Sequence, residues 1–218
     1  TFSSNLPLLV LHTGGRSVSA EARTPAYVTA IDTERGRASL RTRPSHMGRC
    51  QLELRGQSSL GFPKQSYNLE LNDAQGSDME EPLLGLPSES DWVLYSPYSD
   101  KPFLQNFLAY ELFTQMGHYA PRCRFVELFI DTSAAALNRL DGSGDYAGIY
   151  ILMEKIKVDA NRVALARLSP QQNAEPEISG GYIFKKDKDS PGDLNFGTQG
   201  GAGFGAQALK IHEPKPRE

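Results

Sequence analysis

The chain has 218 residues, of which 39% are hydrophobic, and a formal net charge of −3. This length and composition allow one large globular domain, or two lobes, with a sizeable core. The slight negative charge excludes an overall basic field, so neither nucleic acid nor an anionic membrane surface is an expected partner. No stretch of the sequence approaches the roughly 20 consecutive apolar residues that span a bilayer.

The first 49 residues, 1–49, predict a β-rich amino-terminal extension packed on the domain that follows. Two strand-like runs, residues 6–13 and 26–33, lie on either side of a turn-rich segment. An arginine-rich run comes next: Arg35, Arg37, Arg41, Arg43 and Arg49. We interpret this run as a solvated face, and contact with an anionic partner is the alternative.

Residues 50–168 begin with a predicted hairpin that contains the stretch RGQSSLGFPKQSYNLEL. Apolar and polar residues alternate strictly on both sides of the glycine-bearing loop. If the two strands pair, their apolar faces cover one core and their polar faces coincide. Arg55 and Lys64 then lie on one face with the hydroxyls of Ser58 and Ser59. Two cations beside loop amides and hydroxyls form a candidate phosphate site.

The clearest predicted helix is SDKPFLQNFLAYELFTQMG. Ser99 or Asp100 can cap its start, and Gly117 is placed to end it. Apolar side chains recur along it at spacings of three and four: Phe103, Leu104, Phe107, Leu108, Leu112 and Met116. This stripe predicts a helix that covers a sheet, with Glu111 at the margin of the stripe.

Four further runs predict strands in the remainder of the chain. RFVELFID and YAGIYILMEKI are apolar on both faces, which is typical of central strands. SGGYIFKK and ALKIHEP predict two more. Residues 169–218 are rich in glycine, and we expect part of this region to be mobile. Its glycines at 200–205 lack the spacing of a dinucleotide-binding motif.

Candidate metal ligands are few. The four histidines show no paired spacing, and Cys50 and Cys123 lack the spacing of a zinc site. We interpret the two cysteines as buried thiols, and a single disulfide is the alternative. Asp187 and Asp189 could hold a divalent cation with their carboxylates, and a solvated turn is the alternative interpretation.

Four blocks of the sequence, in this order, resemble the CotH family of kinase-like proteins related to spore coat protein H: RGQSSLGFPKQSYNLEL, LLGLPSESDWVLYSPYSDKPFLQNFLAYEL, AGIYILMEKIKVDANRV and SGGYIFKKDK. The resemblance covers residues 50 to about 190. It implies an α+β, protein-kinase-like fold, with a mostly antiparallel sheet covered by one main helix and with an incomplete carboxyl-terminal side. Residues 50–168 would then be the nucleotide-binding lobe, and residues 169–218 the start of the second half.

The resemblance also implies a function and its ligands. CotH-like kinases bind ATP and Mg²⁺ and phosphorylate serine or threonine in protein substrates. The location implied is extracytoplasmic: secreted, on a bacterial surface, or in a spore coat. Arg55, Ser58 and Ser59 match the R-G-x-S-S signature of the family, and Lys64 matches the lysine expected to contact the nucleotide phosphates.

By analogy with the amino-terminal lobe of kinases, the last strand of the lobe leads to the hinge that holds the base. Residues Met153 to Lys155, with Met153 and Glu154 as the candidate binding residues, would supply backbone groups of that hinge. Either Glu111 or Glu154 would pair with Lys64, and the sequence leaves this choice open. For a metal ligand, the sequence offers Asp187.

One departure from the family concerns the catalytic aspartates, which CotH proteins carry in N-x-D-like and W-D-x-D segments. Nothing after Asp187 matches either segment, and Trp92 is the single tryptophan. We therefore expect the amino-terminal portion of a longer enzyme, or else a degenerate member that catalyses nothing. The alternative function is a non-catalytic surface or coat-assembly module with a kinase-like fold.

Overall fold

The computed structural model describes residues 2–33, 36–133, 145–188, 192–199 and 207–215. It consists of two compact units, Thr1–Lys155 and Ile156–Glu218. The glycine run at 200–205 and Asp189 lie outside the described residues, so the predictions made for them stay predictions.

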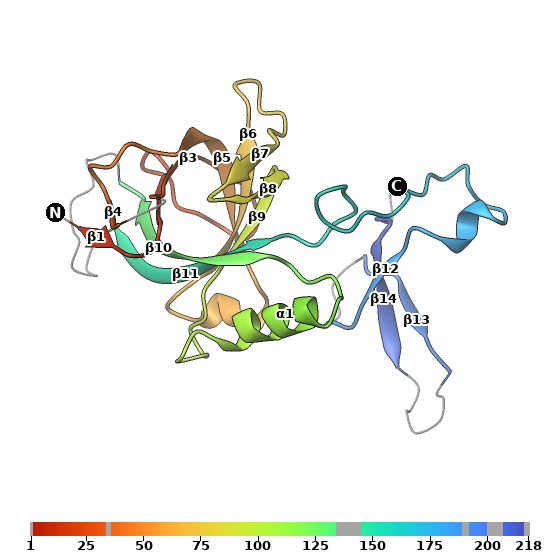
Figure 1. Cartoon of the computed structure of the whole chain (residues 1–218). Coiled ribbons are helices and arrows are strands. Elements are labelled where there is room, and N and C mark those ends of the chain that lie inside the picture. Colours follow the sequence, from red (N-terminus) through yellow and green to blue (C-terminus); the bar gives the residue numbers. More distant parts are fainter. Residues whose placement is uncertain (1, 34–35, 134–144, 189–191, 200–206, 216–218) are drawn as a thin grey trace. The chain divides into compact units, whose positions relative to one another are not determined.

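The first unit is built around a closed barrel of seven strands in the order β10-β11-β9-β6-β5-β3-β2 (Figure 1). The strands are β2 (Leu8–His12), β3 (Thr24–Ile31), β5 (His46–Arg55), β6 (Ser66–Asn72), β9 (Asp91–Tyr95), β10 (Cys123–Asp131) and β11 (Tyr146–Glu154). All neighbouring pairs are antiparallel except β2 with β10, whose parallel pairing closes the barrel. The strands predicted from the sequence over these residues are confirmed.

Shorter elements complete the two units. The first unit also contains β1 (Ser3–Ser4), β4 (Ala38–Ser39), the 3-10 turn η1 (Ser58–Gly61), β7 (Glu81–Leu83), β8 (Leu86–Glu89) and the helix α1 (Gln105–Gln115). The second unit contains the 3-10 turn η2 (Glu177–Ser179), β12 (Ile183–Lys185), β13 (Asn195–Gly197) and β14 (Ala208–Glu213). Strands β12, β14 and β13 form a three-stranded antiparallel sheet in that order.

The core of the first unit fills the interior of the barrel. Leu52 of β5 lies opposite Leu69 of β6, and both side chains are buried inside. The intervening residues point to the outer face, where Gln51 lies opposite Glu70. The predicted coincidence of apolar faces on one side and polar faces on the other is therefore confirmed for this hairpin.

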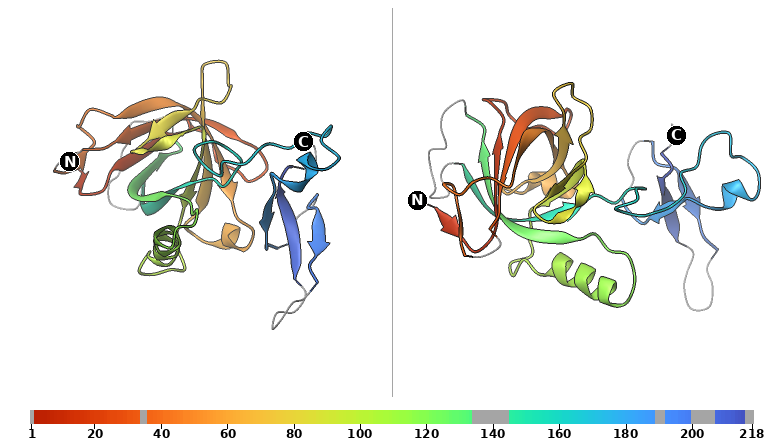
Figure 2. Two further views of the ribbon diagram at one scale, coloured as in Figure 1. Left: turned by 45° about the vertical axis from the view of Figure 1, so that its right-hand side comes forward. Right: turned by 45° about the horizontal axis from the view of Figure 1, so that its top comes forward.

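Helix α1 forms where it was predicted, but its apolar stripe is not buried against a sheet as expected. It is held at its start by Asp100, whose Oδ2 accepts the Gln105 amide at 2.8 Å, and ends before Gly117, which has a φ of +85°. The helix lies outside the barrel (Figure 2), and Phe107 contacts Phe125 of β10 with ring centroids 5.1 Å apart. No residue of the helix is buried, and most of the predicted apolar stripe is exposed: Leu104, Leu108, Leu112 and Met116.

The expected α+β, protein-kinase-like fold with a helix covering a sheet is therefore wrong. The structure is mostly β, and its main body is the seven-stranded barrel. The physical reason is that a sheet closed on itself buries its apolar face against itself, so it needs no helix as a cover. No helix in the described part of the chain is long and apolar enough to cross a membrane.

Both cysteines are free thiols, as predicted, but only Cys50 is fully buried, and Cys123 is half-buried. Cys50 lies in the barrel core, where burial raises the pKa of its thiol to about 12. Cys123 begins β10, and burial, followed by the charges of Glu111 and Glu154, raises its pKa to about 11. Both thiols are therefore protonated and poorly nucleophilic at neutral pH.

Truncation of a leucine inside the barrel should cost far more stability than the same truncation on α1. Leu52 is 0% exposed and Leu112 is 58% exposed. We expect Leu52→Ala to lower the free energy of unfolding by about 2–5 kcal/mol, because it leaves a cavity in a packed interior. Leu112→Ala should change it by no more than about 0.5 kcal/mol. Urea unfolding followed by circular dichroism measures both, and equal losses would contradict the barrel core described here.

Candidate functional site

The loop between β5 and β6 is shaped by close contacts that only some residues permit. Gly56 has a φ of +120°, and a Cβ there would lie 2.0 Å from the Ser59 hydroxyl oxygen. Glycine is therefore strongly favoured at this position, because side chains rarely adopt this φ and a Cβ would also displace the Ser59 hydroxyl. Gln65 holds the far side of the loop, since its Nε2 donates to the carbonyls of Leu60 and Phe62 at 3.0 and 2.7 Å.

Lys64 extends from this loop to β11. Its Nζ donates to the Ile149 carbonyl at 2.6 Å and lies 4.6 Å from the centroid of the Tyr150 ring. Strand β11 pairs with β9 only from Ile151 to Glu154, so Ile149 lies where β11 has no β9 neighbour. Lys64 thus donates to a carbonyl of β11 at a position where β11 has no pairing with β9. Of the three donors of its ammonium group, one is used for this bond.

The surroundings of Lys64 are apolar with one acidic group nearby. Burial lowers the pKa of Lys64, and the charge of Glu127 raises it in part. The Glu127 carboxylate accepts hydrogen bonds from the Tyr146 hydroxyl at 2.6 Å and the Ser4 hydroxyl at 2.7 Å. Glu127 therefore stays fixed on β10 and acts on Lys64 as a nearby charge.

Arg55 lies at the end of β5, opposite Ser66 of β6. Burial lowers the pKa of Arg55, and the charge of Tyr110 on α1 opposes that change. Arg55 and Lys64 therefore have different neighbours, α1 for the first and β11 for the second. The structure places both cations at the loop end of the hairpin, and gives them no shared contact partner among the described residues.

Neither glutamate considered as a partner of Lys64 forms an ion pair with it in the described part of the chain. Glu154 is buried at the end of β11, where its Oε1 lies 2.7 Å from Nη2 of Arg122 and its Oε2 accepts the Arg122 amide at 3.0 Å. Glu111 is exposed on α1 and accepts a hydrogen bond from Gln115 at 2.8 Å. Among the described residues the acidic charge that raises the Lys64 pKa is that of Glu127.

Met153 and Asp187, the other two candidate residues, do not belong to the loop between β5 and β6. Met153 lies within β11, opposite Cys123 on one side and Val93 on the other, so strands flank its backbone on both sides. Its side chain packs in an apolar cluster outside the barrel. Asp187 belongs to the second unit, where its Oδ1 accepts the Lys188 amide at 2.8 Å.

Sequence reasoning missed several residues that shape this site. Tyr150 is 1% exposed, and its hydroxyl donates to the Gln65 carbonyl at 2.8 Å. Gly148 has a φ of +93°, and a Cβ there would lie 3.5 Å from Lys64 Nζ. The glycine in AGIYILME was a visible signal, because a glycine inside an apolar strand often marks a close approach. The contact of Lys64 with the Ile149 backbone carbonyl could not be predicted, because no residue type marks a carbonyl that accepts such a bond.

The fold and this site define a β-barrel protein with a cationic, glycine-bearing loop at one end of the barrel. The model of the CotH kinase protein family matches residues 52–218, most of the sequence, so the chain belongs to the CotH kinase protein family. No curated protein matches the sequence significantly.

The charge of Glu127 should be measurable at Lys64. We expect the Nζ of Lys64 to titrate below the pKa of about 10.4 of a free lysine side chain. Glu127→Gln should lower that pKa further, because it removes a negative charge that favours the ammonium form. The measurement is a pH titration of lysine side-chain resonances by NMR. Glu111→Gln is the matched control and should leave the Lys64 pKa unchanged; a shift on that substitution instead would show that Glu111 is the partner.

Proposed function

We propose that the barrel end at Lys64 binds the phosphate groups of a nucleotide, as the nucleotide-binding part of a CotH-like kinase that acts on serine or threonine of a protein substrate. The observation that carries the proposal is the position of Lys64. Its ammonium group is held by the Ile149 carbonyl and the Tyr150 ring and keeps further donors for an oxyanion. Membership of a kinase family supports the same ligand.

The loop fits phosphate groups by its shape as well as its charge. The Gly56 backbone lies under the Ser59 hydroxyl, and Ser58 and Gly56 are exposed at the tip. Backbone amides and hydroxyls at such a glycine-bearing turn can donate to phosphate oxygens. Lys64 and the loop would hold and orient the phosphates, and the apolar surroundings of Lys64 would strengthen that attraction by excluding water.

Mg²⁺ would neutralise charge on the phosphate oxygens when bound. The loop offers cations and hydroxyls and no carboxylate, so it fits phosphate and not the metal itself. Asp187 stays the predicted metal ligand. The family resemblance supports an extracytoplasmic setting, on a cell surface or in a spore coat, for the protein and its substrate.

The second candidate function is a non-catalytic surface or coat-assembly module. The exposed apolar side chains of α1 favour it, because a contiguous apolar surface is typical of a surface that contacts another protein. This candidate predicts a stable fold that binds no nucleotide.

Calorimetric titration with Mg²⁺ and ATP separates the two functions. We expect saturable binding that Lys64→Ala weakens by about ten-fold or more, because a charge-assisted contact to phosphate is lost. Lys101→Ala is the control: Lys101 is exposed next to α1, where its Nζ donates to the Tyr98 carbonyl at 3.0 Å. Absence of binding by the unsubstituted protein, or equal binding by Lys64→Ala, would reject the nucleotide site.

A further inference from the structure

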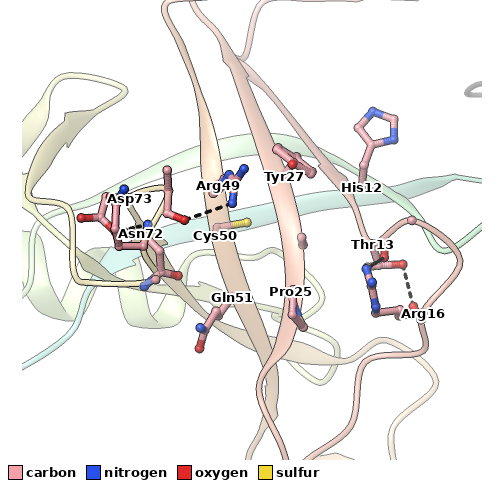
Figure 3. Close-up of a pocket in the computed structure, with 15 residues that line it drawn as sticks. His12, Thr13, Arg16, Pro25, Tyr27, Arg49, Cys50, Gln51, Asn72 and Asp73 are labelled. Carbon is pink, nitrogen blue, oxygen red and sulfur yellow. Dashed lines mark hydrogen bonds between the residues drawn. The ribbon is translucent and has the colours of Figure 1, made fainter.

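A groove of about 460 Å³ lies on the outer face of the barrel, over β3 and β5 (Figure 3). Ala26 and Cys50 belong to the barrel core, so the residues next to them, Tyr27 and Arg49, point outward. Tyr27 lies directly opposite Arg49 on β5 and opposite His12 on β2. These three side chains therefore form one row across three neighbouring strands, with the tyrosine in the middle.

Two short segments form the walls of the groove. One is the loop that follows β2, which contributes Thr13 and Arg16, and the other is the turn 73–76 that follows β6. The turn is held by Asp73, whose Oδ1 accepts the amides of Gln75 and Ser77 at 2.8 Å each. The Asp73 carboxylate of this wall therefore already accepts hydrogen bonds from backbone amides of its own turn.

Each of the two arginines makes one hydrogen bond from its guanidinium group and keeps most of its donors. Nη1 of Arg16 donates to the Thr13 carbonyl at 3.2 Å, and Nη1 of Arg49 donates to the Ala74 carbonyl at 3.4 Å (Figure 3). A guanidinium group has five N–H donors, and for each arginine the others have no partner among the described residues. One guanidinium group comes from the loop that follows β2 and the other from β5 next to the turn 73–76, and each is suited to bidentate contact with an oxyanion.

His12 adds a third polar group at the end of the row. Its Nδ1 lies 3.1 Å from Oδ2 of the buried Asp131. Burial tends to raise the pKa of Asp131, but hydrogen bonds from Ser133 and from His12 outweigh this and hold that pKa below its usual value. Asp131 is therefore a carboxylate at neutral pH, and it orients the His12 ring, whose other nitrogen has no hydrogen-bond partner among the described residues.

An unsatisfied acceptor also lies at this groove. Asn72 is 3% exposed and lines the groove, and its Oδ1 is shielded from solvent and has no hydrogen-bond partner among the described residues. A buried acceptor without a partner costs free energy, so a small turn of the Asn72 amide toward the groove would let a ligand hydroxyl satisfy it. On the other side of Arg49, which lies between the two residues in register, the Tyr27 ring is 56% exposed and offers a flat apolar face.

We propose that this groove binds an acidic saccharide, a sugar unit that carries a carboxylate or a sulfate. The sugar ring lies against Tyr27, its hydroxyls reach Asn72, and its anionic group contacts Arg49 or Arg16. An oxyanion, a ring face and hydroxyl donors on one small molecule match the groups that line the groove.

Two other acidic partners fit the groove less well. A peptide strand would bind by pairing with an exposed sheet edge, and the closed barrel presents none at β3 and β5, each of which has two neighbours. A nucleic acid would need an extended basic track, and the chain has a net charge of −3. The groove is also separate from the nucleotide site, because Arg49 lies six residues along β5 from Arg55, about 20 Å.

The test is an NMR titration of the whole 218-residue protein. The probes are a hyaluronan tetrasaccharide, which carries carboxylates, a chondroitin sulfate tetrasaccharide, which also carries sulfates, and the uncharged chitotetraose. We expect at least one acidic tetrasaccharide to shift the amide resonances of Tyr27, Arg49 and Ala74, with an affinity that falls as salt is added. Chitotetraose should bind at least about ten-fold more weakly.

Tyr27→Ala and Arg49→Gln should each weaken binding about ten-fold or more. Arg37→Gln is the control: it belongs to the same arginine run, but its guanidinium group is held by Ser3 and Asn5. Thermal unfolding of each variant checks that it is folded. The proposal is overturned if neither acidic tetrasaccharide binds, if both groove variants bind normally, or if chitotetraose or a hexaglutamate peptide binds equally well.

Discussion

The parallel pairing of β2 with β10 is the interaction on which the first unit depends. It joins residues as far apart in the chain as His12 and Asp131, which are 119 positions apart and linked by an Nδ1–Oδ2 contact of 3.1 Å. Without it the sheet would have two open edges and an apolar face exposed to water. With it the sheet closes and its core residues pack against one another. Helix α1 is then not needed to cover the core: Phe107 and Tyr110 pack on a small apolar cluster outside the barrel, and most of its other apolar side chains stay exposed.

Closure also places the two candidate binding regions at different positions along β5. The strands are staggered around the barrel, so β11 extends beyond the end of β9 and leaves the Ile149 carbonyl available to Lys64. At the other end of the β5–β6 hairpin, the outer row of Tyr27 and Arg49 remains uncovered. One barrel therefore presents a cationic loop at one end and a separate groove on its side. The family match begins at residue 52, so the cationic loop lies within the matched region, whereas Tyr27 and Arg49 lie before it.

Local periodicity in the sequence predicted the local structure well. Alternation around Leu52 and Leu69 predicted a hairpin and its two faces, and Gly117 predicted the helix end. The barrel was beyond prediction, because a parallel pair of strands this far apart leaves no local pattern. The apolar stripe correctly predicted a helix, but it did not predict how little of that helix is buried. That depends on the sheet, which closes into a barrel and buries its own apolar face. The partner of Lys64 was missed for a similar reason: it is a backbone carbonyl 85 residues away, which no residue type marks.

The central claim is that the barrel end at Lys64 receives the phosphates of a nucleotide. The most direct measurement is the broadening of backbone amide resonances by ATP complexed with the paramagnetic ion Mn²⁺. The account predicts that the amides of Gly56, Ser59 and Ile149 broaden first, while those of Tyr27 and Arg49 stay sharp. Broadening centred away from Lys64, or no selective broadening, would contradict it.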